Sequence, residues 1–353
     1  MYKNEDNLYT NVEISMYWKE RHGMKIIFYG TKPYDRIWFE PMSEQYGYPI
    51  HFLEAGLNED TAKLAEGYDA ACIFVNDEAG AVVIDELADA GVKAILLRCA
   101  GFNQVDLQQA KKRGIMVLRV PGYSPEAVAE FAMGLLLCVN RKIHRAYIRS
   151  RDFNMNINGL MGKDLHEKTV GVVGTGKIGQ AMIHICKGFG MRILAYDLYP
   201  AQIPGIEYVS LEELLKRSDV ISLHCPLTDE NYHMINKESL ALMKNGVYII
   251  NTSRGALIDA PALVDALTEK GRIGGVGLDV YEEESGIFYE DRSNDIMTDP
   301  VLARLTTFPN VIITSHQGYF TEEAMQAIAR ETMDNAHYVA HLGPEKSPKQ
   351  VEA

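Results

Sequence analysis

A glycine-rich loop at residues 174–179 constrains the fold of this chain more than any other sequence feature. The loop reads Gly-Thr-Gly-Lys-Ile-Gly, follows the apolar run 170–173 and opens a stretch with helical periodicity. The next apolar run, 192–196, leads into Asp197. The separation of Asp197 from the loop is close to the ~20 residues typical between a dinucleotide-binding glycine loop and its acidic partner. There the glycines let a pyrophosphate approach the helix N-terminus, and the acid accepts both ribose hydroxyls. The pattern predicts a dinucleotide site that includes Gly174, Gly176, Gly179 and Asp197.

Asp197 also indicates which dinucleotide binds. Its negative charge would repel a 2′-phosphate, and the following Leu198-Tyr199-Pro200 contains no arginine that could hold one. NAD is therefore favoured over NADP. The alternative, a solvated acid at a strand end, is common in general but fits this spacing poorly.

Apolar runs alternate with helical stretches along most of the chain, which predicts parallel α/β sheets. The first series of expected strands is 26–29, 51–53, 71–75, 95–98 and 116–120. The second series is 170–173, 192–196, 220–224, 247–250, 275–278 and 311–314. Six parallel strands in the second series predict a Rossmann-type sheet.

Segments outside these strands suggest how two domains are joined. Ser124, Pro125 and an acid open an apolar helix that links the domains and ends in the cation-rich stretch 141–145. A second helix is expected at 321–342, where it can return to the first domain. The polar residues 1–23 predict a flexible N-terminal extension, and the charged tail 344–353 predicts a loose end.

Length and composition exclude several protein classes. The 353 residues suffice for two domains, and the net charge of −13 without a basic run argues against nucleic acid or an anionic membrane as partner. No apolar stretch approaches the ~20 residues of a membrane span. Five scattered cysteines without a C-x-x-C pair, and no signal-peptide core, indicate a reducing, cytoplasmic setting. Ten histidines show no metal-ligand spacing, so no metal site is expected.

Reactive side chains fall at or just beyond the ends of the second series of strands. Ligands of open parallel sheets bind beyond the carboxyl ends of the strands, so these residues should share one cleft. Arg254 can grip a carboxylate or polarise a carbonyl, His316 can donate a proton, and Glu284 can orient that imidazole and favour its charged form. Singly, each has a plain structural interpretation: a surface ion pair, a structural histidine, or a solvated acidic run. Together, beside an NAD site, they form a coherent set for carbonyl reduction. Asp197, Cys225, Pro226 and Asp279 lie at the same strand ends.

A turn in the first series is a further candidate. Ala100 and Gly101 follow the strand 95–98, and their backbone N–H groups could meet an anion such as a carboxylate. A plain structural turn is nearly as good an interpretation.

These residues together resemble the D-isomer-specific 2-hydroxyacid dehydrogenases, and within them the fermentative bacterial D-lactate dehydrogenases. The resemblance runs from Met24 to the C-terminal region. It is carried by Arg-Cys-Ala-Gly-Phe-Asn-Gln-Val-Asp at 98–106 and by the segments 120–130, 174–179, 251–259, 279–284, 286–291 and 315–317.

The resemblance implies a fold, an activity and a set of site residues. Two Rossmann-like domains are expected, with an NAD-binding domain (123–318) inserted into a substrate domain made of 24–122 and 319–353. The implied activity is reversible hydride transfer between NADH and pyruvate, giving (R)-lactate. The implied catalytic residues are Arg254, Glu284 and His316. Substrate contacts are implied for Ala100, Gly101, Tyr123, Arg254 and His316. NAD contacts are implied for Lys177, Ile178, Asp197, Cys225, Pro226, Asn231, Thr252, Ser253, Arg254 and Asp279.

Several alternatives stay open at this point. Residues 1–23 have no counterpart in the pattern, and the pocket-shaping stretch 317–320 varies among such proteins, so preference among small 2-oxo acids is not fixed. A sister enzyme for a longer 2-oxo acid or a glycerate-type substrate is one alternative. An NAD-sensing corepressor, a binding protein with the same fold, is another, although no partner-binding segment is visible. The resemblance suggests a homodimer or homotetramer.

Overall fold

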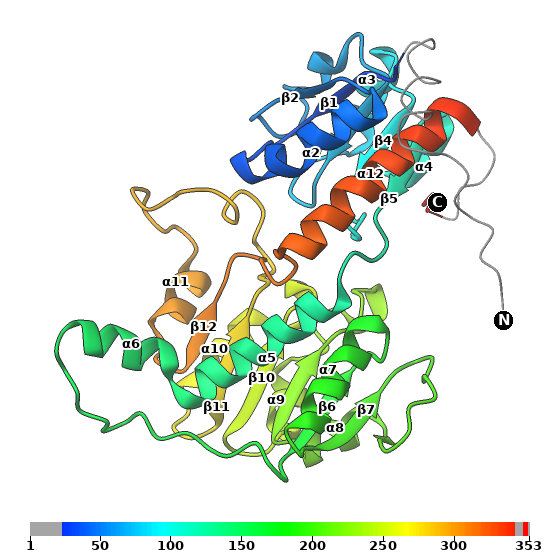
Figure 1. Ribbon diagram of the computed structural model, residues 1–353. Helices are drawn as coiled ribbons and strands as arrows, with labels where there is room; N and C mark the ends of the chain where they lie inside the picture. Colours follow the sequence, from blue (N-terminus) through cyan, green and yellow to red (C-terminus); the bar gives the residue numbers. More distant parts are fainter. Residues whose placement is uncertain (1–22, 343–348, 352–353) are drawn as a thin grey trace. The chain divides into compact units, whose positions relative to one another are not determined.

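The computed structural model describes residues 23–342 and 349–351, in two compact units (Figure 1). Unit 1 comprises residues 1–123 and 321–353, and unit 2 comprises residues 124–320. The sequence-based boundaries were at residues 122/123 and 318/319. Most of the expected N-terminal extension, residues 1–22, lies outside the described residues, as do 343–348 and 352–353.

Unit 1 is built on a five-stranded parallel sheet in the order β2-β1-β3-β4-β5. The strands are β1 (Ile26–Phe28), β2 (Ile50–Phe52), β3 (Ala70–Ile73), β4 (Ala94–Leu97) and β5 (Met116–Arg119). Every residue of β1, β3 and β4 is buried, as expected for parallel strands covered on both faces. The connecting elements are α2 (Pro33–Tyr46), the 3₁₀ turn η1 (Ala62–Ala65), α3 (Ala81–Asp89) and α4 (Leu107–Arg113).

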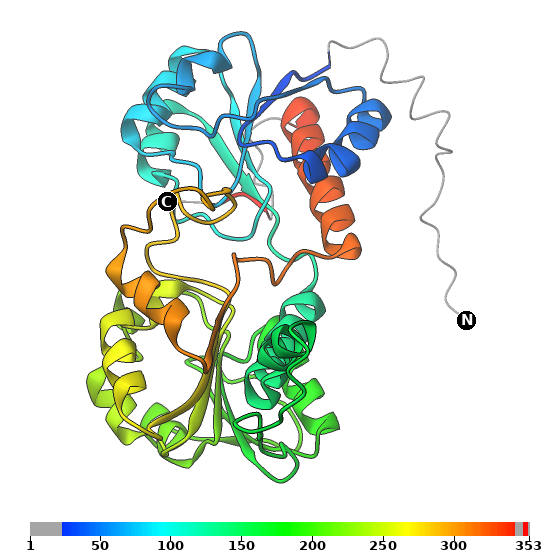
Figure 2. The same cartoon turned by 90° about the vertical axis from the view of Figure 1, so that its left-hand side faces the viewer.

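The chain returns to unit 1 in α12 (Glu322–Leu342), which packs on α2 and against β4 and β5, as predicted (Figures 1 and 2). The prediction of a loose tail is wrong for residues 349–351. Gln350 forms an antiparallel bridge with Leu118, and Val351 N donates to Val117 O at 2.8 Å. These hydrogen bonds give partners to backbone N–H and C=O groups of the edge strand β5. The charged composition of the tail does not indicate this pairing.

Unit 2 contains a seven-stranded parallel sheet in the order β12-β11-β10-β9-β6-β7-β8. Its strands are β6 (Thr169–Val173), β7 (Arg192–Tyr196), β8 (Glu207–Tyr208), β9 (Val220–Leu223), β10 (Val247–Asn251), β11 (Ile273–Leu278) and β12 (Val311–Ile313). The six expected strands are present. The seventh, β8, was not predicted because it is two residues long and has no apolar run.

Helices cover both faces of this sheet, as Figure 2 shows with the sheet nearly edge-on. Alternate side chains of β10 point to the two faces of the sheet. Tyr248 and Ile250 pack with the helices α5 (Pro125–Arg141) and α7 (Lys177–Gly188), and Ile249 packs with the opposite layer. That opposite layer consists of α8 (Leu211–Arg217), α9 (Lys237–Leu242), α10 (Ala260–Thr268) and α11 (Pro300–Thr307).

The helix predicted to start at Ser124 is α5 (Pro125–Arg141), and the Ser124 hydroxyl caps it by accepting from Ala127 N. It was expected to continue through Arg145 but ends at Arg141, because Lys142 has a left-handed backbone with φ of 53°. A separate helix, α6 (Ile143–Arg151), follows and contains no buried residue. In Figure 1, α6 projects from the rest of unit 2.

Candidate active site

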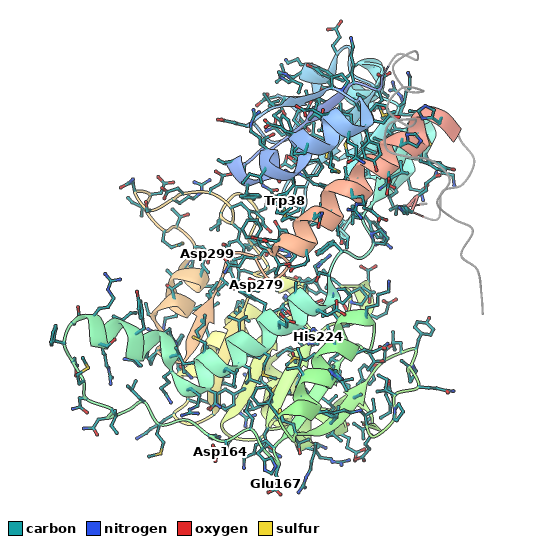
Figure 3. All side chains as sticks on the ribbon, viewed as in Figure 1. Trp38, Asp164, Glu167, His224, Asp279 and Asp299 are labelled. Carbon is teal, nitrogen blue, oxygen red and sulfur yellow. The ribbon has the colours of Figure 1, made fainter. Side chains whose placement is uncertain are left out.

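The predicted site residues of unit 2 lie at one edge of its sheet. Parallel pairing brings all the carboxyl ends of the strands to that edge. Across the sheet, His316 follows β12, Asp279 and Glu284 follow β11, Arg254 follows β10, Cys225 follows β9, the glycine loop follows β6 and Asp197 follows β7. In Figure 3, the labelled Asp279 and His224 lie at this end of unit 2, and Asp164 and Glu167 lie at the other.

His316 and Glu284 form a hydrogen-bonded pair. His316 Nδ1 lies 2.8 Å from Glu284 Oε1, with 18% and 26% of the two side chains exposed. The other carboxylate oxygen, Oε2, accepts from Tyr281 N at 3.1 Å. Tyr289 contributes a contact that was not predicted: its hydroxyl donates to His316 O at 2.9 Å. With Nδ1 held by the carboxylate, Nε2 is the nitrogen left to exchange a proton.

Asp279 holds the turn that carries His316. One carboxylate oxygen accepts from Thr314 Oγ1 at 2.6 Å and from Gln317 N at 2.9 Å, and the other accepts from Gly318 N at 2.7 Å. The Asp279 carbonyl also accepts from His316 N at 2.7 Å. Burial raises the pKa of Asp279, against the lowering effect of these hydrogen bonds. Both carboxylate oxygens are thus engaged by the turn, a role that the predicted NAD contact did not include.

The turn after β10 presents Arg254. Asn251, fully buried, donates from Nδ2 to Arg254 O at 2.8 Å and accepts from Ser253 N at 3.0 Å. Arg254 Nη1 donates to Ser253 O at 2.7 Å, and no other described residue accepts a hydrogen bond from the guanidinium, so its remaining donors are available to a ligand. Gly255 packs so closely on the peptide between Tyr281 and Glu282 that a Cβ would overlap it. Arg254 is therefore anchored directly beside the loop that carries Glu284.

The three glycines of the loop 174–179 differ in their surroundings. Gly174 has φ of +92°, and a Cβ there would lie 2.7 Å from Cys225 N. A Cβ on Gly179 would overlap Gly174 O, whereas a Cβ on Gly176 would meet no atom within 4 Å. Gly176 is the N-cap of α7, whose first N–H groups receive no side-chain cap. Uncapped donors beside open space fit a pyrophosphate, so the cradle is suited to a dinucleotide.

Asp197 lies at the rim of this loop. Its Oδ2 accepts from Thr175 N at 2.5 Å and from Thr175 Oγ1 at 2.9 Å, and its Oδ1 accepts from Tyr199 N at 2.8 Å. Partial burial alone would raise its pKa, but these hydrogen bonds hold the pKa of Asp197 below its ordinary value. The carboxylate is therefore charged at neutral pH and lies beside the glycine loop.

The segment after β9 contains the other predicted NAD residues. Asn231 Nδ2 donates to Pro226 O at 2.7 Å, which brings these two residues together next to Cys225. Burial raises the pKa of the Cys225 thiol to about 11, so it is neutral at physiological pH. Ser253 Oγ donates to Cys225 O at 2.5 Å and so joins this segment to the Arg254 turn.

Two buried polar atoms at this edge have no hydrogen-bond partner among the described residues. They are Thr252 Oγ1, from the predicted set, and His224 Nδ1, which was not predicted. His224 Nε2 lies 2.8 Å from Ser222 Oγ, and burial lowers the pKa of the imidazole to about 4. Unpaired buried polar atoms beside a glycine loop fit a polar ligand such as the dinucleotide.

The remaining candidates belong to unit 1. Ala100 O accepts from Arg119 NH1 at 2.8 Å, and the guanidinium of Arg119 lies over the ring of Phe102 at 5.1 Å. The N–H groups of Ala100 and Gly101 donate no hydrogen bond within the described part of the chain. Tyr123 is the last residue of unit 1 before α5.

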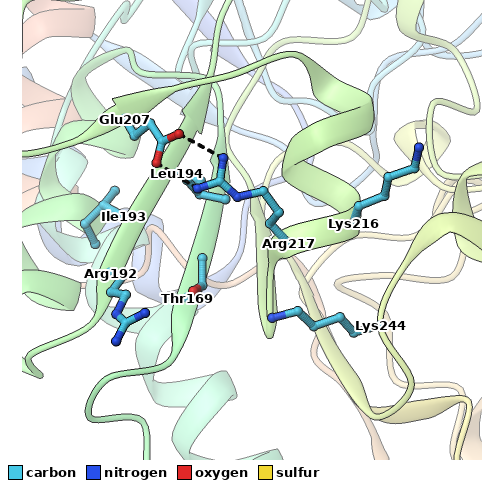
Figure 4. A pocket seen from close by; sticks show the side chains of 8 residues that line it. All are labelled: Thr169, Arg192, Ile193, Leu194, Glu207, Lys216, Arg217 and Lys244. Carbon is cyan, nitrogen blue, oxygen red and sulfur yellow. Dashed lines mark hydrogen bonds and ion pairs between the residues drawn. The ribbon is translucent and has the colours of Figure 1, made fainter.

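A pocket at the opposite edge of the unit 2 sheet is chemically different (Figure 4). It is lined by the first residues of β6 and β7 and by four cations, Arg192, Lys216, Arg217 and Lys244. Three of these cations are paired: Lys216 with Glu212, Arg217 with Glu207 and Glu213, and Lys244 with Asp219. None of the predicted site residues lines this pocket.

Two further properties bear on the class of protein. No helix within residues 23–342 and 349–351 combines the length and the apolar character that a membrane crossing needs. In the same residues, His, Cys, Asp and Glu side chains do not gather in groups of three or more that could hold a metal ion.

The fold, the glycine loop and the strand-end residues define an NAD-binding α/β dehydrogenase. Residues 133–318 match the family model described as "D-isomer specific 2-hydroxyacid dehydrogenase, NAD binding domain". The chain is also 52% identical to D-lactate dehydrogenase of Escherichia coli strain K12 over 315 residues, 88% of this chain and 95% of that protein. It belongs to the D-isomer specific 2-hydroxyacid dehydrogenase family.

Solved structures agree with this assignment. The structure of the pyruvate reductase of Chlamydomonas reinhardtii matches with a TM-score of 0.84 and 47% identity, over 90% of this chain and 97% of that chain. The apo-structure of the Escherichia coli D-lactate dehydrogenase matches with a TM-score of 0.83 and 48% identity, over 93% and 100%. The predicted family and fold class are confirmed, and so is NAD as cofactor.

Proposed function

We propose that this chain is an NAD-dependent D-lactate dehydrogenase that interconverts pyruvate and (R)-lactate. The observation that carries the proposal is the His316–Glu284 pair at 2.8 Å. The pair follows β12 and β11, and Arg254 follows β10, the strand next to β11 in the sheet. The glycine loop and Asp197 lie at the same edge of the sheet. Relatives with about half of their residues identical carry the name D-lactate dehydrogenase, which supports this substrate.

Arg254 binds the substrate in this proposal. A guanidinium presents a planar fork that matches a carboxylate, and it can also donate to the neighbouring carbonyl oxygen of a 2-oxo acid. Negative charge grows on that oxygen during reduction, so a fixed cation stabilises the transition state more than the ground state. The Asn251 and Gly255 contacts hold the turn in place for this purpose.

His316 exchanges the proton. During reduction the charged imidazole donates a proton from Nε2 to the carbonyl oxygen, and during oxidation the neutral imidazole accepts the hydroxyl proton. The Glu284 carboxylate holds Nδ1 at 2.8 Å. Asp279 and Tyr289 fix the turn around His316, so the imidazole ring keeps the same orientation during reduction and during oxidation.

The dinucleotide binds along the strand-end edge. The bound nicotinamide supplies or accepts the hydride. The N–H groups at the start of α7, uncapped beside the open space at Gly176, would hold the pyrophosphate, and Asp197 would accept from the ribose hydroxyls. The other proposed contacts to the dinucleotide come from Lys177 and Ile178 in the first turn of α7, from the Cys225-Pro226 segment, and from Asn231, Thr252 and Ser253. Unit 2 is in this view the NAD-binding domain, inserted into the substrate domain of unit 1.

Three residues of unit 1 are further substrate contacts in this proposal. The free N–H groups of Ala100 and Gly101 donate to the substrate carboxylate, and Tyr123 contacts the substrate. The Arg119 guanidinium orients this turn by binding the Ala100 carbonyl.

The protein forms a homo-oligomer through α6 and the segment after it. Phe153, Met155, Ile157 and Met161 are 68–90% exposed, and α6 buries no residue. Isolated exposed apolar residues are common, but a run of this kind marks an interface. The arginines of α6 favour an acidic partner, and a second copy of this chain carries a net charge of −13. Sedimentation should show a dimer or tetramer that Phe153→Asp dissociates, whereas a monomeric wild type would contradict the proposal.

The activity is tested by following NADH absorbance with a panel of 2-oxo acids. We expect rapid NADH oxidation with pyruvate and slower oxidation with longer-chain or hydroxylated 2-oxo acids. A higher kcat/KM for a longer acid would assign the chain to a sister enzyme of the family. Binding of NADH without turnover of any 2-oxo acid would instead support the sensing-protein alternative.

A further inference from the structure

The segment that carries Glu284 forms a second histidine–glutamate pair. His233 Nε2 lies 2.9 Å from both carboxylate oxygens of Glu282, and the Tyr232 hydroxyl donates to Glu282 Oε1 at 2.7 Å. The rings of Tyr232 and His233 stack with their centroids 3.9 Å apart. Only 19% of the Glu282 side chain is exposed, although the next residue, Glu283, is exposed. Two glutamates of one acidic run, Glu282 and Glu284, thus each bind a histidine, and the two histidines lie in different loops.

The pair joins three segments of the candidate active site. His233 N donates to Ala256 O, and Ile235 N donates to Leu257 O, both at 2.9 Å, so the chain after Asn231 runs beside the chain after Arg254. Gly255 in turn packs against the peptide that precedes Glu282. The Glu282 carboxylate closes this arrangement by binding back to His233.

The backbone of His233 indicates that these contacts determine its position. Its φ of 51° lies in the left-handed region, which a non-glycine residue adopts only when its surroundings impose it. His316 has a φ of 52°, so both paired histidines share this feature. Without the Glu282 contacts, the loop 231–235 would lose a side-chain restraint that opposes relaxation to an ordinary conformation.

We propose that Glu282 is a positioning residue, whose carboxylate holds His233 and Tyr232 so that the turn carrying Arg254 stays fixed against the loop carrying Glu284. The inference rests on the proposed function, because it assigns to Arg254 the binding of the substrate carboxylate. It concerns the placement of Arg254 and not proton transfer. The His316–Glu284 contact has separate anchors, the Asp279 turn and the hydrogen bond from Tyr281 OH to Asp299 at 2.6 Å.

The separation of these two tasks defines the expected kinetics. Glu282→Ala should raise the KM for pyruvate by about tenfold, with a smaller change in kcat, because substrate binding by Arg254 becomes less well oriented. The pH profile of kcat should stay where it is in the wild type. Glu282→Gln should recover most of the lost affinity, since its amide oxygen can accept from both Tyr232 and His233.

The experiment compares steady-state kinetics of the full-length wild type with the three variants Glu282→Ala, Glu282→Gln and Glu283→Ala. Glu283→Ala is the matched control and should behave as the wild type. A wild-type KM in Glu282→Ala, a shifted pH profile of kcat, or no recovery in Glu282→Gln would each overturn the inference. If Glu282→Ala does not fold, His233→Asn tests the other side of the pair, and a wild-type KM for pyruvate in that variant would also overturn it.

The design separates failure of the inference from failure of the proposed function. A wild type that turns over pyruvate, with Glu282→Ala indistinguishable from Glu283→Ala, contradicts only the role of Glu282. A wild type that reduces no 2-oxo acid contradicts the proposed function itself, whatever the variants show.

Discussion

His316 and Glu284 are 32 residues apart in the chain, yet their side chains meet at 2.8 Å because β11 and β12 end side by side at one edge of the sheet. The carboxylate faces Nδ1 and leaves Nε2 for the substrate. An imidazole held in this way can serve both directions of a reversible reaction, and its charge decides which direction it serves.

The two directions should respond oppositely to pH. Reduction needs a charged His316 and should fall as the pH rises, whereas oxidation needs the neutral ring and should rise. Glu284→Gln removes the carboxylate that faces Nδ1, so the pH profiles of both directions should move relative to the wild type. His316→Gln should lower both rates by about 10²–10⁴-fold.

The measurement is kcat in each direction as a function of pH, with Glu283→Gln as the control. If Glu284→Gln leaves both profiles at the positions seen in the control, Glu284 does not influence the proton-exchanging group.

Arg254 should not be replaceable by another cation. Arg254→Lys keeps the charge but loses the planar fork, so kcat/KM for pyruvate should drop by about 10²-fold or more while NADH binding changes little. Arg304→Lys, an exposed arginine on α11, is the control. A value of kcat/KM for pyruvate within a factor of about two of the wild type in Arg254→Lys would remove Arg254 from the substrate site.

The glycine loop allows structure and cofactor binding to be separated. Gly179→Ala would overlap Gly174 O and should destabilise the fold by about 1–3 kcal/mol, the usual cost of overpacking. Gly176→Ala meets open space and an allowed backbone, so its melting temperature should match the wild type while its KM for NADH rises. The test combines thermal unfolding with NADH titration. A normal KM for NADH in Gly176→Ala would argue against a pyrophosphate at this position.

Asp197 should set the preference for NADH over NADPH. Asp197→Ala removes an acceptor for the ribose hydroxyls and a charge that repels a 2′-phosphate, so the ratio of kcat/KM for the two cofactors should narrow. Thr175→Val removes one hydrogen bond to the carboxylate but keeps the charge, and should leave the ratio nearly unchanged.

The pKa of Asp197 adds a pH test to this prediction. Hydrogen bonds hold that pKa below its ordinary value, so the group stays charged, and the NADH preference of the wild type should be constant from about pH 5 to about pH 8. A preference that weakens toward the acidic end of this range, or an unchanged ratio in Asp197→Ala, would place the ribose elsewhere.

The sequence revealed the architecture because buried parallel strands are continuous apolar runs. Strands such as 247–251 and 220–223 are buried on both faces and mostly apolar, so their positions could be predicted to within a residue or two. Once six strands were placed, parallel topology alone collected Arg254, Glu284 and His316 at one edge. The strand β8 was missed because it has two residues and no apolar run, and the break at Lys142 was missed because a single left-handed residue leaves the apolar pattern unchanged.

The finer features of the site could not be predicted for a related reason. Glu282 lies in an acidic run that is typical of a solvated surface, and its pairing with His233 spans 49 residues. The family resemblance implied an NAD contact for Asp279, and its place at a strand end did not reveal that its oxygens also bind the turn around His316. Periodicity identifies which element a side chain belongs to, whereas its partner depends on the folded arrangement of loops.

Chiral analysis of the product tests the central claim most directly. Wild-type protein is incubated with pyruvate and NADH until the cofactor is consumed, and the lactate is resolved into its enantiomers. Arg254 and His316 hold the carboxylate and the carbonyl oxygen of the substrate in one orientation, so the nicotinamide would deliver its hydride to only one face of the carbonyl carbon. One enantiomer should therefore form, and family membership sets it as (R)-lactate. Predominant (R)-lactate in amounts equal to the NADH consumed is the expected result. Predominant (S)-lactate, a racemic product, or no lactate at all would contradict the account.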